Sequence, residues 1–397
     1  MAENKEKKVL NVPNLRFPEF QGEWQEERLS DIADLSKGIG ISKDQLSADG
    51  EPCILYGELY TKYKSETIKE VISKTNIDNT KLVKSKANDV IIPCSGETAE
   101  EIATARCVLK DDVLLGGDLN IIRLHGYDGS FMSYQLNGKR KYDIAKVAQG
   151  VSVVHLYGEH LKNIKTINPG LNEQKKITNL LSLLDERIST QNKIIEKLES
   201  LIKGISNRLL YADNSMSIRI EEMLIERSER TKKNNQYEIL SSTVNGIFSQ
   251  RDYFSKDIAS DNNVGYKIHL HDIVLSPQNL WMGNINFNDK FDIGIVSPSY
   301  KVFSIADGFD KKYVAALLKT HHALYNYMLV SEQGASTVRR NLNYEAFEQL
   351  VFKIPSLNKQ QEIGHVISLL KSQLENANLL IKTYNSQKQY LLRQMFI

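Results

Sequence analysis

The chain has 397 residues, a length that accommodates two or three domains of ordinary size. With 25% charged and 41% hydrophobic residues, its composition excludes wholesale disorder and low-complexity classes. The 51 Lys and Arg residues nearly balance 49 Asp and Glu, for a formal net charge of +2. This balance excludes a protein that holds nucleic acid through overall positive charge, so any such contact must come from local patches.

The three cysteines, Cys53, Cys94 and Cys107, contain no C-x-x-C pair, so neither a disulfide framework nor a zinc ribbon is indicated. The first residues are polar and charged and lack the apolar stretch of a secretory signal. No apolar run approaches the ~20 residues of a membrane span. We therefore expect a soluble, cytoplasmic protein.

The first globular region, residues 15–168, has the composition of a mixed α/β domain. Segments 52–56, 89–93 and 120–124 are rich in β-branched or aromatic residues and end in Gly, Pro or Asp, as strands do. Residues 131–148 are expected to form one helix.

A long amphipathic helix is expected next, because aliphatic residues recur in steps of four and three with no proline between them. One glutamine interrupts this seam, where it could set the helix register or be a tolerated defect. The predicted seam comprises Ile177, Leu181, Leu184, Ile188, Gln191, Ile195, Leu198 and Ile202.

The second half repeats this order. Segments 272–276 and 300–305 are expected to be strands and 311–329 one helix, followed by a second, weaker seam. Ala377, Tyr384 and Lys388 dilute that seam. Its apolar members are Ile363, Ile367, Leu370, Leu374, Ile381 and Leu391. Each long helix is the natural partner of the other within the chain, with separate packing of each as the alternative.

Two motifs show that the chain is a tandem repeat. The sequence QGVSVV at 149–154 recurs as QGASTV at 333–338, and PGLNEQ at 169–174 recurs as PSLNKQ at 355–360. The two offsets, 184 and 186 residues, nearly agree. Two copies of such a unit fill the chain, which excludes a solenoid of many short repeats.

Motifs of catalysis are missing. No G-x-x-x-x-G-K-[ST] loop, Asn-Pro-Pro-aromatic tetrapeptide or G-x-S-x-G elbow occurs, and no set of His, Cys, Asp and Glu has the spacing of metal ligands. The chain thus has the features of a protein that recognises a ligand, without catalytic residues, metal or cofactor of its own.

A duplicated domain on a helical spacer suits a ligand with two half-sites, such as DNA. Arg, Lys, Gln, Asn, Ser and Thr are the residue types that contact bases and phosphates, and they gather in the loops after equivalent strands and around the QGxSxV motifs. Ordinary turns and solvated charges are the competing interpretation. The candidates are Ser95, Gly96, Thr98, Lys139, Arg140, Gln149, Ser152, His155, Gln278, Asn279, Trp281, Gln333, Ser336, Thr337, Arg339 and Arg340.

These motifs resemble a known family. The opening NLRFPEF with Trp24, the QGxSxV motifs, and PxLNEQKKI and PxLNKQQEI before heptad helices are similar to specificity (S) subunits of type I restriction–modification systems. The resemblance extends over nearly the whole chain. It implies an α+β fold in which two mixed α/β target recognition domains in tandem are separated by two long helices that form an antiparallel intramolecular coiled coil.

The resemblance also implies the organisation of the chain. The first target recognition domain would occupy residues 1–170, the first spacer helix 171–212, the second domain 213–356 and the second helix 357–397. Each domain would read one half of a bipartite, asymmetric DNA target, and the helices would set the gap. The chain would be non-catalytic and would bind two methyltransferase subunits and restriction subunits. S-adenosylmethionine, ATP and Mg would belong to those partners.

A different class of function stays open from the residues alone. In an adaptor or scaffold protein, the coiled coil would be the functional element and the globular halves would bind proteins. Salt-sensitive DNA binding would distinguish the two. A nucleic-acid enzyme with diverged motifs is a further alternative, which binding of S-adenosylmethionine or ATP to the isolated chain would reveal.

Overall fold

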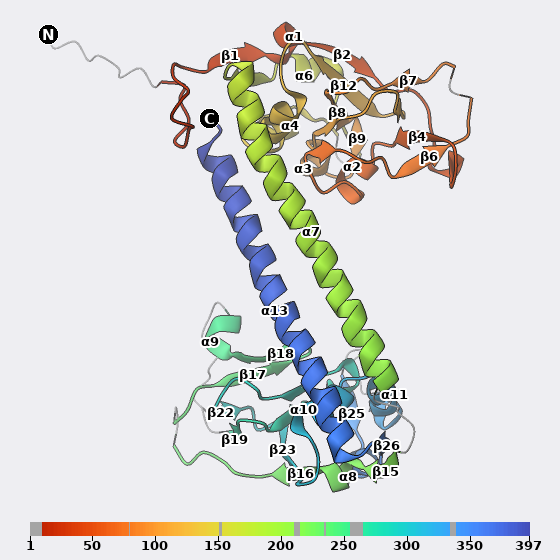
Figure 1. The fold of residues 1–397 in the computed structure, drawn as a ribbon, viewed down its shortest axis with the longest axis vertical. Helices are drawn as coiled ribbons and strands as arrows, with labels where there is room; N and C mark the ends of the chain where they lie inside the picture. Colours follow the sequence, from red (N-terminus) through yellow and green to blue (C-terminus); the bar gives the residue numbers. More distant parts are fainter. Residues whose placement is uncertain are drawn as a thin grey trace, which may run out of the picture. The chain divides into compact units, whose positions relative to one another are not determined.

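The computed structural model describes residues 10–78, 80–150, 153–209, 215–233, 236–254, 265–333 and 339–397 (Figure 1). The chain divides into two compact units. Unit 1 comprises residues 1–192 and 380–397, and unit 2 comprises residues 193–379. Two long helices, α7 (Leu171–Leu209) and α13 (Leu357–Gln394), each contribute one part to each unit.

Unit 1 is built on two five-stranded sheets and two short ribbons. The first sheet has the order β2-β12-β8-β10-β5, the second β3-β6-β4-β11-β7, and the ribbons are β1-β14 and β13-β9. The strands are β1 (Gln25–Arg28), β2 (Ala33–Lys37), β3 (Leu46–Ser47), β4 (Glu51–Ile54), β5 (Thr67–Ile68), β6 (Ser73–Thr75), β7 (Val83–Lys84), β8 (Asp89–Pro93), β9 (Ser95–Gly96), β10 (Arg106–Val108), β11 (Leu114–Leu115), β12 (Leu119–Leu124), β13 (Val154–His155) and β14 (Lys165–Asn168).

Short helices cover these sheets. They are α1 (Leu29–Ile32), the 3-10 turn η1 (Lys43–Gln45), α2 (Glu58–Thr61), α3 (Ala99–Ile102), α4 (Gly129–Asn137), α5 (Lys141–Val147) and α6 (Gly158–Lys162). The central strand β8 is buried along its whole length, because sheet neighbours flank it and apolar side chains cover both faces. Val90 and Ile92 pack with the helices, whereas Ile91 packs with the second sheet.

Unit 2 repeats the order with a smaller sheet, β16-β23-β20-β21, and the ribbons β15-β26, β17-β18, β19-β22 and β24-β25. Its strands are β15 (Met216–Arg219), β16 (Leu224–Arg227), β17 (Leu240–Thr243), β18 (Gly246–Ser249), β19 (Tyr266–His269), β20 (Ile273–Leu275), β21 (Ile285–Phe287), β22 (Ile293–Val296), β23 (Lys301–Ile305), β24 (Ser331–Gln333), β25 (Arg340–Leu342) and β26 (Val351–Ile354). Its short helices are α8 (Ile220–Met223), α9 (Gln250–Tyr253), the turn η2 (Leu280–Met282), α10 (Lys311–Leu317), α11 (His321–Leu329) and α12 (Tyr344–Glu348).

The two long helices run antiparallel in each unit. In unit 1, Ile177 and Leu181 near the start of α7 pack with Leu391 and Met395 near the end of α13. In unit 2, Ile205 near the end of α7 packs on the core that holds Ile363 and Ile367 of α13. Both pairings bury aliphatic side chains, which is the driving force that a heptad seam provides.

Two helix predictions were wrong in the same way. Residues 131–148 form α4 and α5, because the chain turns at Gly138, the C-cap of α4. Residues 311–329 form α10 and α11, because the Thr320 side chain accepts a hydrogen bond from the N–H of Ala323 and starts a new helix. Apolar periodicity continues through both breaks, so it does not reveal them.

Candidate nucleic-acid interface

The repeated PxLNxQ motif joins each long helix to its globular domain. In unit 1, buried Gln174 donates to the carbonyl of Pro169 at 2.7 Å and accepts from the N–H of Asp128 at 2.9 Å. Asp128 in turn caps α4. One amide side chain therefore ties the start of α7, the preceding strand and α4 together.

Unit 2 has the same arrangement. Buried Gln360 donates to the carbonyl of Pro355 at 2.9 Å and accepts from the N–H of Asp310 at 3.0 Å, and Asp310 caps α10. The duplication seen in the sequence is thus a duplication of a specific hydrogen-bonded joint. The sequence analysis noticed the motif but assigned no role to its glutamine.

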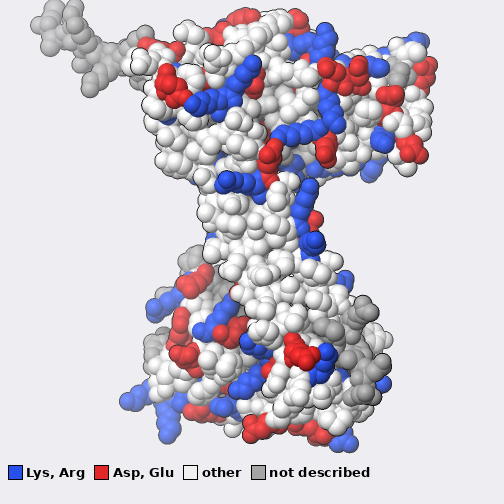
Figure 2. All heavy atoms as spheres, in the orientation of Figure 1, with Lys and Arg blue, Asp and Glu red and all other residues white. Residues whose placement is uncertain are grey.

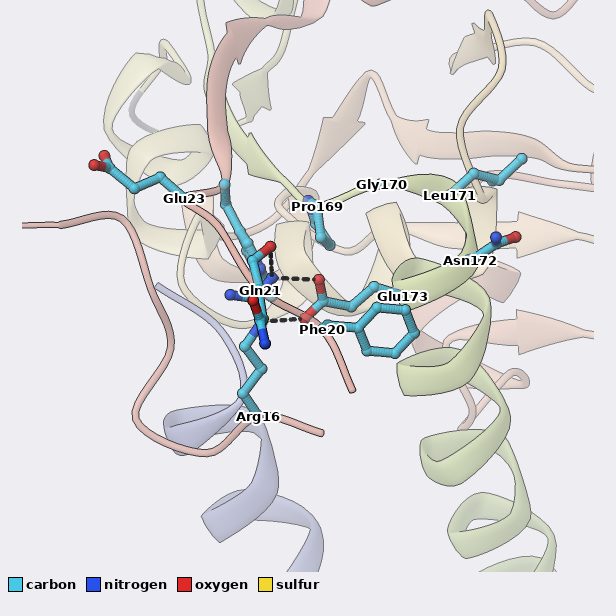
Figure 3. A pocket seen from close by; sticks show the side chains of 10 residues that line it. Arg16, Phe20, Gln21, Glu23, Pro169, Gly170, Leu171, Asn172 and Glu173 are labelled. Atoms are coloured by element: carbon cyan, nitrogen blue, oxygen red, sulfur yellow. Dashed lines mark hydrogen bonds and ion pairs between the residues drawn. The ribbon is translucent and has the colours of Figure 1, made fainter. Parts of the chain in front are cut away.

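The opening NLRFPEF segment fastens unit 1. The Arg16 guanidinium donates to both carboxylate oxygens of Glu173 at 2.8 and 2.7 Å (Figure 3), and this hydrogen bonding raises the pKa of Arg16. The N–H of Leu15 donates to the carbonyl of Gln394 near the end of α13. A cavity of about 370 Å³ lies beside Glu173. The segment thereby links the start of α7 with the end of α13.

Four candidate DNA-contacting residues of unit 1 lie together. Ser95 and Gly96 form β9, which pairs with Val154 and His155 of β13, and Gln149 bridges His155 through the backbone. His155 and Gln149 are exposed, whereas buried Ser95 donates to Asp118. We call these residues, together with Lys37 and Tyr157, the first surface.

The sequence analysis missed Lys37 and Tyr157. The Tyr157 ring stacks on His155, with centroids 6.2 Å apart, and the ammonium of Lys37 lies 5.6 Å from the centre of the Tyr157 ring. Both residues are exposed. Tyr157 comes two positions after His155 and could have been found from that position, but Lys37 lies on a distant strand and only the fold brings it there.

Five candidates of unit 2 also lie together, and we call them the second surface: Gln278, Trp281, Gln333, Arg339 and Arg340. Gln333 pairs with Arg340 across β24 and β25, and the N–H of Arg340 donates to the carbonyl of Gln278 at 3.1 Å. The Arg340 guanidinium lies 5.0 Å from the Trp281 ring centre and donates to two backbone carbonyls. Arg340 is therefore held in place by its own domain, while Arg339 and both glutamines are exposed.

One backbone hydrogen bond recurs in the two surfaces. In unit 1 the N–H of Leu156 donates to the carbonyl of Cys94, and in unit 2 the N–H of Arg340 donates to that of Gln278. Leu156 and Arg340 are 184 positions apart in the chain, and so are Cys94 and Gln278. At this link Leu156 is buried, whereas Arg340 reaches Trp281. The two domains therefore share this backbone link and differ in the side chains that lie at it.

The other candidates have varied positions. Thr98 caps α3, Arg140 donates to Asp143 and to the carbonyl of Ile397, and Asn279 lies at the start of η2. Lys139 is exposed at the turn between α4 and α5. Ser152, Ser336 and Thr337 lie outside the described residues.

The predicted seam residues face inward to different degrees. Some are buried: Ile177, Leu181, Leu184, Gln191, Ile363 and Ile367. The rest are half-buried: Ile188, Ile195, Leu198, Ile202, Leu370, Leu374, Ile381 and Leu391.

The three cysteine thiols are buried in unit 1. Burial raises the pKa of Cys53 and Cys94 to about 11 and of Cys107 to about 12, so these thiols are protonated near neutral pH. Basic and acidic side chains are interspersed on the face shown in Figure 2. In the described part of the chain, no group of His, Cys, Asp and Glu is placed to hold a metal ion, and no helix has the length and apolarity to cross a membrane.

Residues 21–200 match the family model described as the type I restriction modification DNA specificity domain. This part of the chain is similar to the DNA specificity domain of type I restriction–modification systems. The resemblance indicated by the repeated motifs is thereby confirmed. The matched residues contain the first globular domain and most of α7, so the specificity domain includes the joint at Gln174.

Two similar proteins have related descriptions. The chain is 29% identical over 206 residues to the specificity subunit of the type I restriction enzyme MjaVIII of Methanocaldococcus jannaschii. This alignment covers 52% of the chain and 45% of the relative, so the chain spans about half the length of the curated relative it matches. The crystal structure of the type I restriction-modification S subunit from M. genitalium superposes with a TM-score of 0.66 at 15% identity, covering 97% of this chain and 99% of that one. This likeness confirms the predicted fold class: two mixed α/β domains with two long helices.

Proposed function

We propose that the chain is the non-catalytic DNA specificity subunit of a type I restriction–modification complex. Each unit reads one half of a bipartite, asymmetric DNA target, and the long helices set the gap between the half-sites. The observation that carries the proposal is the match to a DNA specificity domain at 21–200, whose glutamine joint recurs in unit 2. No feature of the described residues favours the adaptor alternative over this one.

The first and second surfaces are the proposed reading sites. On the first, exposed Gln149 and His155 supply hydrogen-bonding groups, and Lys37 supplies a positive charge for a phosphate. On the second, Arg339 is the proposed base or phosphate contact, and Arg340 with Trp281 forms the wall beside it. Equivalent backbones with different side chains would give one protein two half-site specificities.

A duplicated row of exposed apolar residues supports binding of two copies of one partner. Leu180 and Val366 are 36% and 40% exposed, Leu183 and Leu369 are 51% and 52% exposed, and Ile194 and Leu380 are 44% and 41% exposed. Each pair is 186 positions apart, and each member precedes a seam position by one residue, about 100° around its helix. Exposed apolar residues in a row are typical of protein interfaces.

We assign this docking row to methyltransferase subunits, one on each helix. Restriction subunits would complete the complex, and S-adenosylmethionine, ATP and Mg would bind to these partners. The cytoplasmic location stays a prediction. A chain with recognition surfaces and no catalytic constellation in its described part needs partners to supply the chemistry.

The deciding experiment compares methylated adenines in the source genome with and without the gene for this chain. We expect one bipartite motif with a fixed gap to be methylated, and its methylation to disappear on deletion and return on complementation. An unchanged methylation pattern would contradict the proposal. A tagged chain should also capture an adenine methyltransferase, whereas capture of other proteins alone would favour the adaptor.

The docking row has its own test. Leu183→Lys with Leu369→Lys should reduce co-purification of the methyltransferase at least tenfold, because a charge replaces an apolar contact on both helices. Ile72→Lys is the matched control, since Ile72 is an exposed apolar residue outside both long helices. Equal capture by the double variant and the control would remove the row as the docking site.

A further inference from the structure

One buried charge cluster in unit 1 joins both long helices to the globular domain. The ammonium of Lys388 on α13 lies 2.6 Å from a carboxylate oxygen of Glu66, in the segment before β5, and 2.6 Å from one of Asp185 on α7. The side chains are 14%, 12% and 7% exposed, respectively. We call these three residues the lysine cluster.

Further polar groups hold the cluster in place. Asp185 also accepts hydrogen bonds from the hydroxyls of Tyr134 at 2.8 Å and Ser65 at 2.9 Å. Burial lowers the pKa of Lys388, but the attraction of Glu66 and Asp185 outweighs it, so the pKa is raised overall. The lysine therefore stays charged between its two carboxylates.

A buried charge cluster contributes little net stability compared with an apolar core of the same volume. Removing charges from water is costly, and a well-packed apolar set of the same volume is often as stable. A single buried lysine in a helical seam instead specifies which register the helices adopt, at a cost in stability. The question is therefore whether another register could satisfy these carboxylates.

The seam positions of α13 next to Lys388 offer no second cation for these carboxylates. A shift of one heptad toward either end would bring Ile381 or Met395 to the place of Lys388, and a shift by half a heptad would bring Tyr384 or Leu391. Each of these leaves two buried carboxylates without a counter-charge, which is strongly unfavourable. The cluster therefore favours one axial position of α13 over the neighbouring positions.

The equivalent positions in unit 2 hold different residues. Ile202 corresponds to Lys388 and Lys371 to Asp185, each 186 positions away, so the lysine cluster is not repeated at these positions. The aliphatic contacts of α7 and α13 are compatible with several registers, because aliphatic side chains pack in many combinations. The lysine cluster therefore adds register information that the aliphatic contacts lack.

We propose that Lys388, Glu66 and Asp185 are positioning residues that fix the axial register of α13 against α7 and the first domain. The same residues then fix the length of the gap between the two DNA half-sites, an inference that rests on the proposed function. A change of register by one heptad would move the helix by about 10 Å.

The test replaces the cluster by neutral groups of similar size in the full-length chain: Glu66→Gln, Asp185→Asn and Lys388→Met together. Spin labels attached through Thr190→Cys and Gln387→Cys, both exposed positions, report the distance between the helices, and the three native cysteines are buried. We expect one narrow distance in the parent chain and a broad or multiple distribution in the triple variant. Lys388→Arg in the parent chain keeps the charge and should keep the narrow distance.

A narrow, unchanged distance in the triple variant would overturn the proposal. If that variant does not fold, Glu66→Gln with Asp185→Asn takes its place, because it removes both carboxylates that hold Lys388, and an unchanged distance there would equally overturn the proposal. The second readout is adenine methylation by the assembled complex, where the variant should modify targets with altered gaps at least tenfold above the parent. If the parent directs no methylation, the proposed function fails while the distance measurement still decides the register.

Discussion

The two units share their hydrogen-bonded joints and differ in what they place around them. Gln174 and Gln360 make the same contacts with a proline carbonyl and a helix-capping aspartate. Yet Lys37, His155 and Tyr157 gather at the sheet edge of unit 1, and Arg340 stacks on Trp281 at the equivalent edge of unit 2. Duplication has kept the groups that hold backbones together, while the exposed side chains have diverged.

The largest difference between the units should appear at Lys388. Lys388→Met would leave two buried carboxylates around a neutral side chain and lower the free energy of unfolding by about 3–5 kcal/mol. Ile202→Met at the equivalent position of unit 2 should cost less than about 1.5 kcal/mol. Urea unfolding of both variants measures this, and equal costs would contradict the asymmetry.

At the glutamine joints, in contrast to Lys388, we expect the same loss of stability in both units. Gln174→Leu and Gln360→Leu each leave a buried proline carbonyl and a backbone N–H without a partner, so each should cost about 2–3 kcal/mol. Thermal unfolding of the two variants, with exposed Lys175→Leu as control, provides the comparison. A large cost in one unit and none in the other would show that the joints are not energetically equivalent.

The two surfaces should read different halves of the target. Arg339→Ala in the assembled complex should weaken DNA binding by about 1–3 kcal/mol, roughly 5- to 150-fold, and relax one base preference in one half-site only. His155→Ala should do the same in the other half-site. Binding is measured at fixed salt against single-base variants of the methylated motif, with exposed Arg219→Ala on β15 as control. A uniform loss over both half-sites would argue against separate reading.

A smaller effect concerns pH and distinguishes unit 2. Burial, with repulsion from Lys371, lowers the pKa of Lys319 to about 8. Because the unfolded chain binds this proton up to about pH 10.5, Lys319 should make stability rise between pH 8 and 10.5, by about 1–2 kcal/mol. Lys319→Met should remove this rise, seen as the difference between the two unfolding curves. Parallel curves would show that Lys319 titrates normally.

The repeat, the two long helices and the family resemblance could be predicted from the sequence, because they depend on periodicity and on motifs within short stretches. The members of the second surface were also candidates from the sequence, since Gln278 and Trp281 follow a predicted strand and Gln333 and Arg339 lie at the second QGxSxV motif; their role in DNA binding stays a prediction. It mistook α4–α5 and α10–α11 for single helices, because a glycine turn and a threonine cap interrupt helices without interrupting apolar spacing.

Contacts between residues far apart in the chain could be seen only in the tertiary structure. Lys388 reads in the sequence as a defect in the second seam, but the fold places it between Glu66 and Asp185, 322 and 203 positions away in the chain. Lys37 reaches Tyr157 through neighbouring strands, and Arg340 reaches Trp281 through a backbone hydrogen bond at Gln278. Local patterns fix which faces become buried, whereas the partners of a buried charge depend on chain segments that no local pattern connects.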